Sequence, residues 1–260
     1  MTTLPPVVPP LPPSVTFERG LPVGTAVTWL REGWRDLTVK PGLSLAYGAA
    51  VCLVSLAVVW GMFRFGWDDV LFPALAGFLI VGPIMAIGLY EKSRRLALRE
   101  DVTLLDMILV RAKSRGQILF IGALLCLLML LWMRAAVIIY ALFFGLRPFP
   151  GIDHIVAMLF TTPTGWAMLV VGTLVGGLFA AFSFAISAVS VPMLLNERVD
   201  AFTAMGTSMA LVWRNLPVML AWGALVLGLI VAGLATCLLG LIVVFPLLGH
   251  GTWHAYRAIR

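Results

Sequence analysis

Long apolar runs alternate with short polar segments along most of this chain of 260 residues. A helix needs roughly 20 apolar residues to cross a hydrocarbon core of about 30 Å. Four runs reach that length, at 43–63, 70–90, 118–144 and 166–195. The pattern therefore predicts an all-α protein whose helices span a membrane.

A fifth run, 216–256, is too long for a single span. As one straight helix its 41 residues would extend about 60 Å, twice the thickness of the hydrocarbon core. Gly233 and Gly240 bracket a place where a tight turn would divide the run into helices at 216–234 and 238–256. We therefore expect a polytopic bundle of six transmembrane helices, which forms one domain over residues 17–260.

Three polar segments precede apolar runs in a similar way, at 23–40, 103–115 and 201–214. Each carries apolar residues at helical spacing and ends in cations, which is typical of a helix that lies along the membrane surface. Glycines at the start of the following runs, Gly48, Gly122 and Gly223, fall in register. The spacings to the next prolines differ, and a true repeat keeps its period. Three repeats of an interfacial helix plus a transmembrane hairpin, or a chance likeness, both stay open.

The composition places the chain in the membrane class. Hydrophobic residues make up 61% of it and charged residues 12%, with a mean hydropathy of +1.03, whereas soluble domains carry about 25% charged residues. The first 16 residues are rich in proline, which favours extended backbone. We expect them to form a disordered cytoplasmic tail.

The net charge of +6 reports topology rather than a nucleic-acid site. If the six spans alternate, 15 of the 18 lysines and arginines fall on one side of the membrane. Such an imbalance places the cationic side in the cytoplasm. We expect a multi-pass protein of the bacterial inner membrane, with both termini cytoplasmic and no nucleic-acid partner.

Arg134 is a charge inside an apolar run, which costs about 2.5–3.5 kcal/mol on insertion scales. In one interpretation it lines a cavity and binds a polar partner. In the other it extends to the outer headgroups while the end of its helix tilts. The sequence favours the second interpretation and leaves the first open.

His250 and His254 lie one helical turn apart on the last predicted span, a spacing that can present two imidazoles to one metal. Two ligands are too few for a closed site. The more favoured interpretation makes His250 a packing residue and His254 part of an interfacial anchor with Trp253, Tyr256 and Arg257. The three cysteines show no paired spacing, so we expect neither a disulfide framework nor a structural metal.

Prolines within apolar sequence predict helix kinks at Pro83, Pro192 and Pro246. The carbonyls that a kink frees can coordinate ions in transporters, although kinks that only shape packing are commoner.

Small residues concentrate in the fourth span and predict close helix packing on one face. The partner of that face is either a neighbouring helix or a second protein. The residues are Gly172, Gly176, Gly177 and Ala180.

Several strings resemble a family of uncharacterised bacterial integral membrane proteins that is well represented in alphaproteobacteria. They are G-W-R-D-L from Gly33, P-G-L-S-L-A-Y-G from Pro41, the run from Ala76 to Arg95, and the ending from Gly240. Some relatives carry the label cytochrome c oxidase subunit I. Such a subunit has more spans and more histidine ligands than this chain, whose histidines are His154, His250 and His254. The resemblance implies a membrane protein and no particular activity.

The sequence contains no phosphate-binding glycine-rich loop, no nucleophile elbow and no acidic pair within a predicted span. We therefore expect no catalytic residues, no enzyme activity and no cofactor. The leading hypothesis is a non-catalytic accessory, assembly or membrane-organising factor that contacts lipid and a membrane-protein partner or a second copy, one version of it alongside a respiratory or redox complex. The alternatives are a transporter or channel for a small solute or lipid, and a haem or copper carrier.

Overall fold

A computed structural model describes residues 20–145 and 149–260, so the predicted tail lies outside the described residues. Every regular element in the described ranges is a helix. The predicted all-α class is therefore confirmed.

Five helical segments are long and apolar enough to cross a membrane. They correspond to the four predicted single spans and to the first half of the divided run. The segments are α2 (Pro41–Phe65), Asp68–Ala97 with α3 (Leu71–Met85) and α4 (Ile87–Ala97), α6 (Arg115–Phe144), Pro163–Asn196 with α8 (Pro163–Ser187) and α9 (Ser190–Asn196), and α11 (Leu216–Ala235).

The sixth predicted span, α12 (Leu241–Ile259), is not among these five. The chain does turn between α11 and α12, where Cys237 and Leu238 adopt the left-handed conformation. Thr236 closes this turn by accepting a hydrogen bond from the Gly240 amide at 2.8 Å. The second half of α12 carries His250, His254 and an arginine, which lower its apolar character. A six-span topology is therefore not confirmed.

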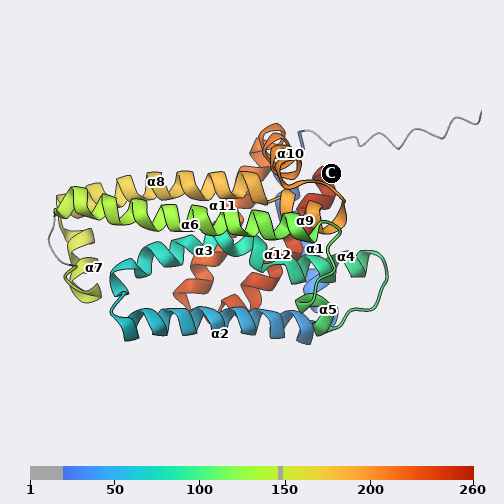
Figure 1. Cartoon of the computed structure of the whole chain (residues 1–260), viewed down its shortest axis with the longest axis horizontal. Helices are drawn as coiled ribbons and strands as arrows, with labels where there is room; N and C mark the ends of the chain where they lie inside the picture. The colour runs from blue at the N-terminus through green and yellow to red at the C-terminus, as the bar shows by residue number, and fades with distance from the viewer. Residues whose placement is uncertain (1–19, 146–148) are drawn as a thin grey trace, which may run out of the picture.

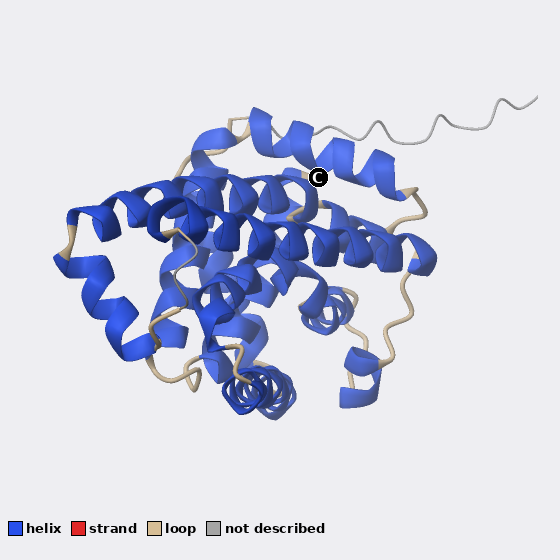
Figure 2. Ribbon diagram, turned by 60° about the vertical axis from the view of Figure 1, so that its left-hand side comes forward, coloured by secondary structure: helices blue, strands red, loops and turns tan. Residues whose placement is uncertain are grey.

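α12 lies at the centre of the bundle and packs on α1 (Thr25–Thr38), α2, α4 and α11. On its other side α6 pairs with α3 and α8. Figure 1 shows α2, α6 and α8 running along the long axis of the molecule, with the C-terminus, α1, α4 and α9 at the same end. Figure 2 shows the same arrangement turned, with helices joined by loops and turns.

Two predicted kinks coincide with helix breaks. Pro83 lies inside α3, which ends two residues later, and the chain resumes as α4 after Ala86. Pro192 lies in α9, directly after the break that separates α8 from α9. Pro246 lies inside α12, which continues past it to Ile259.

Short helices connect the long ones. α10 (Ala201–Arg214) coincides with the third predicted interfacial segment, and α1 falls within the first. The second segment forms only α5 (Leu104–Ile108), after which the chain is irregular until α6. The threefold repeat is therefore not confirmed. At the opposite end of the bundle, α7 (Ile152–Thr161) forms in a connection that the sequence analysis did not predict as helical.

Two glycines allow α12 to approach its neighbours at backbone distance. A Cβ at Gly48 of α2 would lie 2.2 Å from the carbonyl oxygen of Ile242, and one at Gly33 of α1 would lie 2.6 Å from the amide nitrogen of Gly251. Both contacts are with backbone, which cannot move aside as a side chain can. These positions therefore fix how closely α1 and α2 pack on α12.

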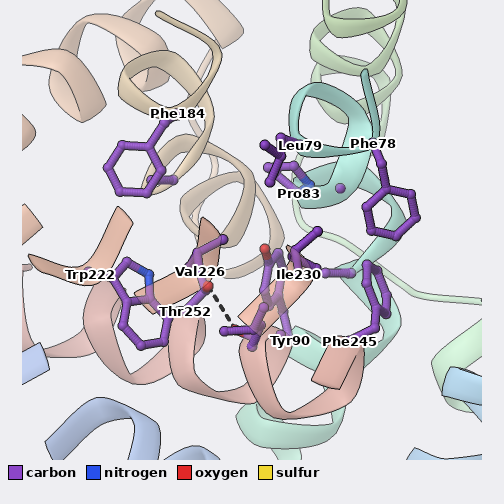
Figure 3. A pocket seen from close by; sticks show the side chains of 15 residues that line it. Phe78, Leu79, Pro83, Tyr90, Phe184, Trp222, Val226, Ile230, Phe245 and Thr252 are labelled. Atoms are coloured by element: carbon purple, nitrogen blue, oxygen red, sulfur yellow. Dashed lines mark hydrogen bonds between the residues drawn. The ribbon is translucent and has the colours of Figure 1, made fainter. Parts of the chain in front are cut away.

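A cavity of about 80 Å³ lies in the core between α3, α8, α11 and α12 (Figure 3). Its lining is almost entirely apolar, with Trp222, Tyr90 and Thr252 as the residues that carry polar atoms. Other lining residues include Phe78, Pro83, Phe184, Val226, Ile230 and Phe245.

Candidate functional site

Hydrogen-bonded polar side chains lie in a row inside the bundle, where α1, α2, α4 and α12 meet. Lys92 Nζ is 2.7 Å from Ser44 Oγ, which is 2.9 Å from His250 Nε2. On the other edge of the ring, His250 Nδ1 is 2.8 Å from Ser93 Oγ. None of these four side chains belongs to a residue more than 1% exposed. Together with Asp36, we call them the buried polar chain.

The direction of these hydrogen bonds follows from the two ends of the buried polar chain. The Ser93 hydroxyl donates to Asp36 Oδ2 at 2.5 Å. His250 then donates from Nδ1 to Ser93, and its Nε2 accepts from the Ser44 hydroxyl. Lys92 donates to Ser44 and, at 2.6 Å, to the carbonyl of Val39 just beyond α1. The row therefore runs from a cation to a carboxylate, and both nitrogens of the buried imidazole are paired.

Asp36 continues the row towards the surface through His254. His254 Nε2 is 2.9 Å from Asp36 Oδ2, and its Nδ1 is 3.1 Å from Glu32 Oε2. Burial opposes the charge on Asp36, but the hydrogen bonds from His254 and Ser93 outweigh it and lower the pKa of this carboxyl below its ordinary value. An ionised carboxylate thus ties α1 to α12.

A second charged cluster fixes α5. Glu91 is 1% exposed and receives two hydrogen bonds of 2.8 Å from Arg94 and one of 2.8 Å from Arg95. Arg95 also reaches Asp106 of α5 at 2.9 Å. The buried carboxylate is thus paired by arginines of its own helix, and Arg95 links it to α5 through Asp106.

The helix α10 is fixed by a buried hydroxyl. Ser208 donates to the carbonyl of Ala185 at 2.7 Å and accepts from the amide of Val189 at 3.2 Å. These backbone groups lie at the break between α8 and α9, where the regular helical pattern is interrupted. The Asp200 side chain caps the start of α10 by accepting from the Thr203 amide.

Each of these three helices turns an apolar stripe outward, and we call α1, α5 and α10 together the collar. Exposed arginines accompany the stripes, as in helices that lie at a lipid headgroup boundary. Figure 1 shows α5 and α10 on opposite sides of the same end of the bundle. The exposed apolar residues are Val27 and Trp34 on α1, Leu105 and Ile108 on α5, and Phe202, Met209 and Trp213 on α10.

Arg134, the charge that the sequence places inside a span, is exposed on the outer surface of α6. It is not among the residues that line the cavity. The structure thus puts it on the side of the helix that faces away from the core.

The small residues of α8 separate into two groups. A Cβ at Gly176 would lie 2.8 Å from the Trp132 ring of α6, so this glycine makes room for a neighbouring helix. Gly172 and Gly177 have no atom within 4 Å of a built Cβ, and Ala180 is half-buried. A contact with a second protein at this face stays a hypothesis.

The two histidines of α12 differ in their surroundings. His250 is fully buried within the polar chain, whereas His254 lies nearer the surface between Asp36 and Glu32. Within residues 20–145 and 149–260 no group of three or more His, Cys, Asp or Glu side chains is placed to hold a metal ion.

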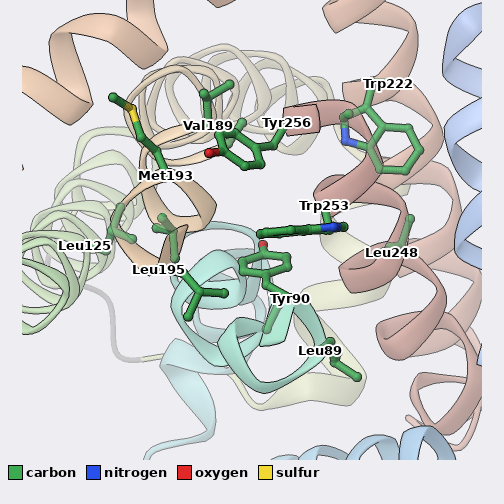
Figure 4. Packing of buried hydrophobic residues seen from close by; sticks show 14 of the residues in the cluster. Leu89, Tyr90, Leu125, Val189, Met193, Leu195, Trp222, Leu248, Trp253 and Tyr256 are labelled. Atoms are coloured by element: carbon green, nitrogen blue, oxygen red, sulfur yellow. The ribbon is translucent and has the colours of Figure 1, made fainter. Parts of the chain in front are cut away.

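Trp253 and Tyr256, which the sequence groups with His254 as an interfacial anchor, are each only 1% exposed. Figure 4 shows both rings inside the hydrophobic packing, with Tyr90 beneath Trp253. The interpretation of these two residues as membrane-surface anchors is therefore wrong. They are buried because α4 and α9 cover this side of α12.

The local sequence pattern does not predict Lys92, Ser44 and Asp36 as members of one site. One signal in the sequence points to buried polar residues at this position. Glu91 to Ser93 directly follow an apolar run and continue the same helix, α4. Their partners come from α1 and α12, and Asp36 and His254 are 218 residues apart.

Comparison with known proteins agrees with a membrane location. No curated protein and no solved structure matches the chain. Residues 71–196, from the start of α3 to the end of α9, match the family described as predicted integral membrane protein (DUF2189). This stretch is therefore similar to a family of predicted integral membrane proteins, in agreement with the resemblance seen in the sequence.

Proposed function

We propose that the protein is a non-catalytic, membrane-organising accessory factor of the bacterial inner membrane. In this proposal the collar lies in the headgroup region of the cytoplasmic leaflet and enlarges the area that the protein occupies there. The apolar faces of such helices enter about 5–10 Å into the boundary between headgroups and acyl chains. The protein would then favour membrane that curves with its cytoplasmic leaflet on the convex side.

The observation that carries the proposal is that all three collar helices combine an outward apolar stripe with a polar contact to the long helices. Asp36 anchors α1, Asp106 anchors α5 and Ser208 anchors α10. Helices held in this way keep their position when lipids rearrange around them. At the opposite end of the described bundle only α7 lies across the ends of the long helices.

The distribution of charge supports a cytoplasmic position of the collar. Glu91 and its arginines, the arginines of α1 and α10, and the C-terminal Arg260 all lie at the collar end. Cationic connections are retained in the cytoplasm during insertion. The collar would therefore meet the anionic lipids of the inner leaflet, which attract cations.

The test compares the orientation of the protein in large and small vesicles of phosphatidylethanolamine and phosphatidylglycerol. A membrane-impermeant maleimide reports orientation through Glu100→Cys, an exposed position before α5, in a background without the native cysteines. The proposal predicts that the fraction with the collar outward rises as vesicles become smaller. Phe202→Ala with Trp213→Ala should weaken this dependence.

The matched control is Leu130→Ala with Leu131→Ala. These residues are 58% and 60% exposed on α6, within a long span rather than in the collar. The control should keep the wild-type dependence on vesicle size. An orientation that is independent of vesicle size in the wild type, or that changes equally in both double variants, would contradict the proposal.

The geometry gives less support to the alternatives. Transport of a polar solute past Arg134 would need that side chain in a hydrated cavity, whereas it lies on the outer face of α6 and the cavity is apolar. A haem or copper carrier would need a free ring nitrogen on His250, and both of its nitrogens are hydrogen-bonded to serine hydroxyls.

A further inference from the structure

Three cations surround an open pocket where α6 begins, at the collar end of the bundle. The lining of this pocket contains Lys113, Arg115 and Arg198, and all three residues are exposed. Asp200 is the acidic residue of the lining, and its carboxylate accepts a hydrogen bond from the Thr203 amide at 2.9 Å. The pocket therefore carries an excess of positive charge.

The two chain segments that form the pocket are joined by hydrogen bonds. The Ser114 hydroxyl donates to the carbonyl of Glu197 at 2.8 Å and accepts from the amide of Val199 at 3.1 Å. Gln117 Oε1 accepts from the Ala201 amide at 3.0 Å. Figure 1 shows this end of α6 next to α9. Contacts between the start of α6 and the connection from α9 to α10 thus bring the three cations to one place.

The three cations are not neutralised by carboxylates of the protein. Glu197, which lies next to the pocket in sequence, accepts from Tyr256 at 2.7 Å and from Arg260 at 2.6 Å. Lys113 attracts this carboxylate from a longer distance. Among the residues that the structure describes, the three cations of the pocket form no ion pair. They therefore remain available to an anion from outside the chain.

The first amides of α6 point to the same chemistry. Ser114 precedes the helix but does not cap it, because its hydroxyl is bound to the connection after α9. The amides of Arg115 and Gly116 thus have no acceptor within the described ranges. A Cβ built at Gly116 meets no atom within 4 Å, so no neighbouring segment covers this side of the helix. Free amides at the start of a helix bind phosphate groups.

We propose that this pocket binds the phosphate group of an anionic phospholipid, such as phosphatidylglycerol. The side chains of Lys113, Arg115 and Arg198 would donate charge-assisted hydrogen bonds to the phosphate oxygens. A zwitterionic headgroup also carries an ammonium group, which the three cations would repel. The pocket should therefore select lipids with a net negative charge. The site requires no curvature preference of the collar, so the two proposals can fail separately.

Apolar residues next to the pocket favour a lipid over a free phosphate ion. Leu119 and Phe120 follow Arg115 and Gly116 by about one helical turn, or about 6 Å along α6, and both are exposed. The ring centroid of Phe120 lies 5.4 Å from that of Phe202 on α10. The acyl chains of a lipid whose phosphate lies in the pocket would contact this apolar surface.

The experiment measures lipid binding to the full chain in a non-ionic detergent by native mass spectrometry. Phosphatidylglycerol and phosphatidylcholine are added in equal amounts. The proposal predicts that the first phosphatidylglycerol binds with about tenfold higher affinity than phosphatidylcholine. Arg115→Gln with Arg198→Gln should remove most of this preference. Equal affinity of the wild type for the two lipids would overturn the proposal.

The matched control is Arg31→Gln with Arg35→Gln. These two exposed arginines lie on α1 at the same end of the bundle, so the control loses the same charge outside the pocket. It should keep the wild-type preference for phosphatidylglycerol. An equal loss of preference in the two double variants would mean that overall charge selects the lipid, and would overturn the assignment to the pocket.

A third variant separates lipid binding from folding. Gly116→Asp places a carboxylate at the second residue of α6, where an acidic side chain stabilises a helix. It should keep the unfolding midpoint in detergent and lose the preference for phosphatidylglycerol, because its carboxylate takes the place of the phosphate. An unchanged preference in this variant would overturn the placement of the phosphate at the start of α6.

Thermal unfolding distinguishes a lipid from a soluble anion. Phosphatidylglycerol should raise the unfolding midpoint of the wild type, whereas inorganic phosphate should not, when sodium chloride keeps the ionic strength equal. An equal rise with inorganic phosphate that disappears in Arg115→Gln with Arg198→Gln would assign the pocket to a soluble phosphate and overturn the lipid assignment.

Discussion

The hydroxyl of Ser93 donates to the carboxylate of Asp36 across 2.5 Å, and this bond joins the buried part of α4 to α1. Ser93 is fully enclosed, whereas Asp36 is reached from the surface through His254. The pair is therefore the point at which the interior of the bundle and the collar are connected. Loss of the hydrogen bond between Ser93 and Asp36 should loosen α1 before it affects the long helices.

We expect Asp36→Asn to lower the free energy of unfolding by about 2 kcal/mol, because the acceptor of the hydrogen bonds from Ser93 and His254 loses its charge. Thermal unfolding in detergent measures this loss, and hydrogen exchange should show faster opening of α1 than of α6. Glu32→Gln provides the control. Glu32 also contacts His254, but its side chain is 40% exposed, so we expect an effect below about 0.5 kcal/mol. Equal losses in the two variants would show that Asp36 has no special role.

Acid should weaken the same contacts. Burial opposes ionisation of Asp36 and of Glu197, but hydrogen bonds from His254 and Ser93 to Asp36, and from Arg260 and Tyr256 to Glu197, lower both pKa values below the ordinary 3.8 and 4.5. A carboxyl with a lowered pKa adds stability that is fully present above its unfolded-state pKa and is lost as the pH falls through the folded-state pKa.

The unfolding midpoint should therefore fall as the pH drops below about 4.5, through the lowered pKa values of both carboxyls. The double variant Asp36→Asn with Glu197→Gln should lose less of its unfolding midpoint over this pH range than the wild type does. Asp69→Asn changes an exposed carboxyl at the other end of the bundle and serves as the control. If the unfolding midpoint of the double variant falls with pH as steeply as that of the wild type, these two carboxyls are not the cause.

The contact between α2 and α12 is sensitive to a single methyl group. Gly48→Ala would bring a Cβ to 2.2 Å from the Ile242 carbonyl, so the helices must separate, and we expect a loss of about 3 kcal/mol. Gly61→Ala lies on the same helix with open space around it, and should be neutral or stabilising by up to about 1 kcal/mol. Unfolding in detergent measures the stability of the two variants. A neutral Gly48→Ala would mean that α2 and α12 are not in backbone contact at this position.

The number of crossings can be tested with three single cysteines. Asp69→Cys, Glu100→Cys and Arg257→Cys are exposed positions after α2, after α4 and near the end of α12. If α12 crosses the membrane, an impermeant maleimide applied to intact cells or spheroplasts should label position 69 and neither of the other two. Labelling of position 257 together with position 69 would mean that α12 returns without crossing.

Apolar run length predicted the five membrane-capable helices because that signal is local. The break near Gly240 was also local, since turn residues interrupt the run at the place where α11 ends and α12 begins. The predicted helices at 23–40 and 201–214 correspond to α1 and α10 for the same reason. These parts of the fold depend on neighbouring residues alone.

The buried polar chain depends on residues far apart in sequence and could not be assembled from local pattern. His250 stood out as a polar residue in a span, but its partners Ser44 and Ser93 come from two other helices. Lys92 lies beyond the predicted span 70–90, whereas α4 carries it into the core and the residues after α1 provide its carbonyl partners. Burial of Trp253 and Tyr256 likewise follows from helices that pack beside them, not from their own segment.

The reliance of α1 on α12 has a consequence for biosynthesis. α1 leaves the ribosome well before α12, its main packing partner, so His254 can reach Asp36 only after α12 has been synthesised. Until then Asp36 and Trp29 lack the contacts that they make in the folded protein. A message that stops before α12 would thus release a product with an undocked first helix, which proteases that survey the membrane could recognise as unfinished.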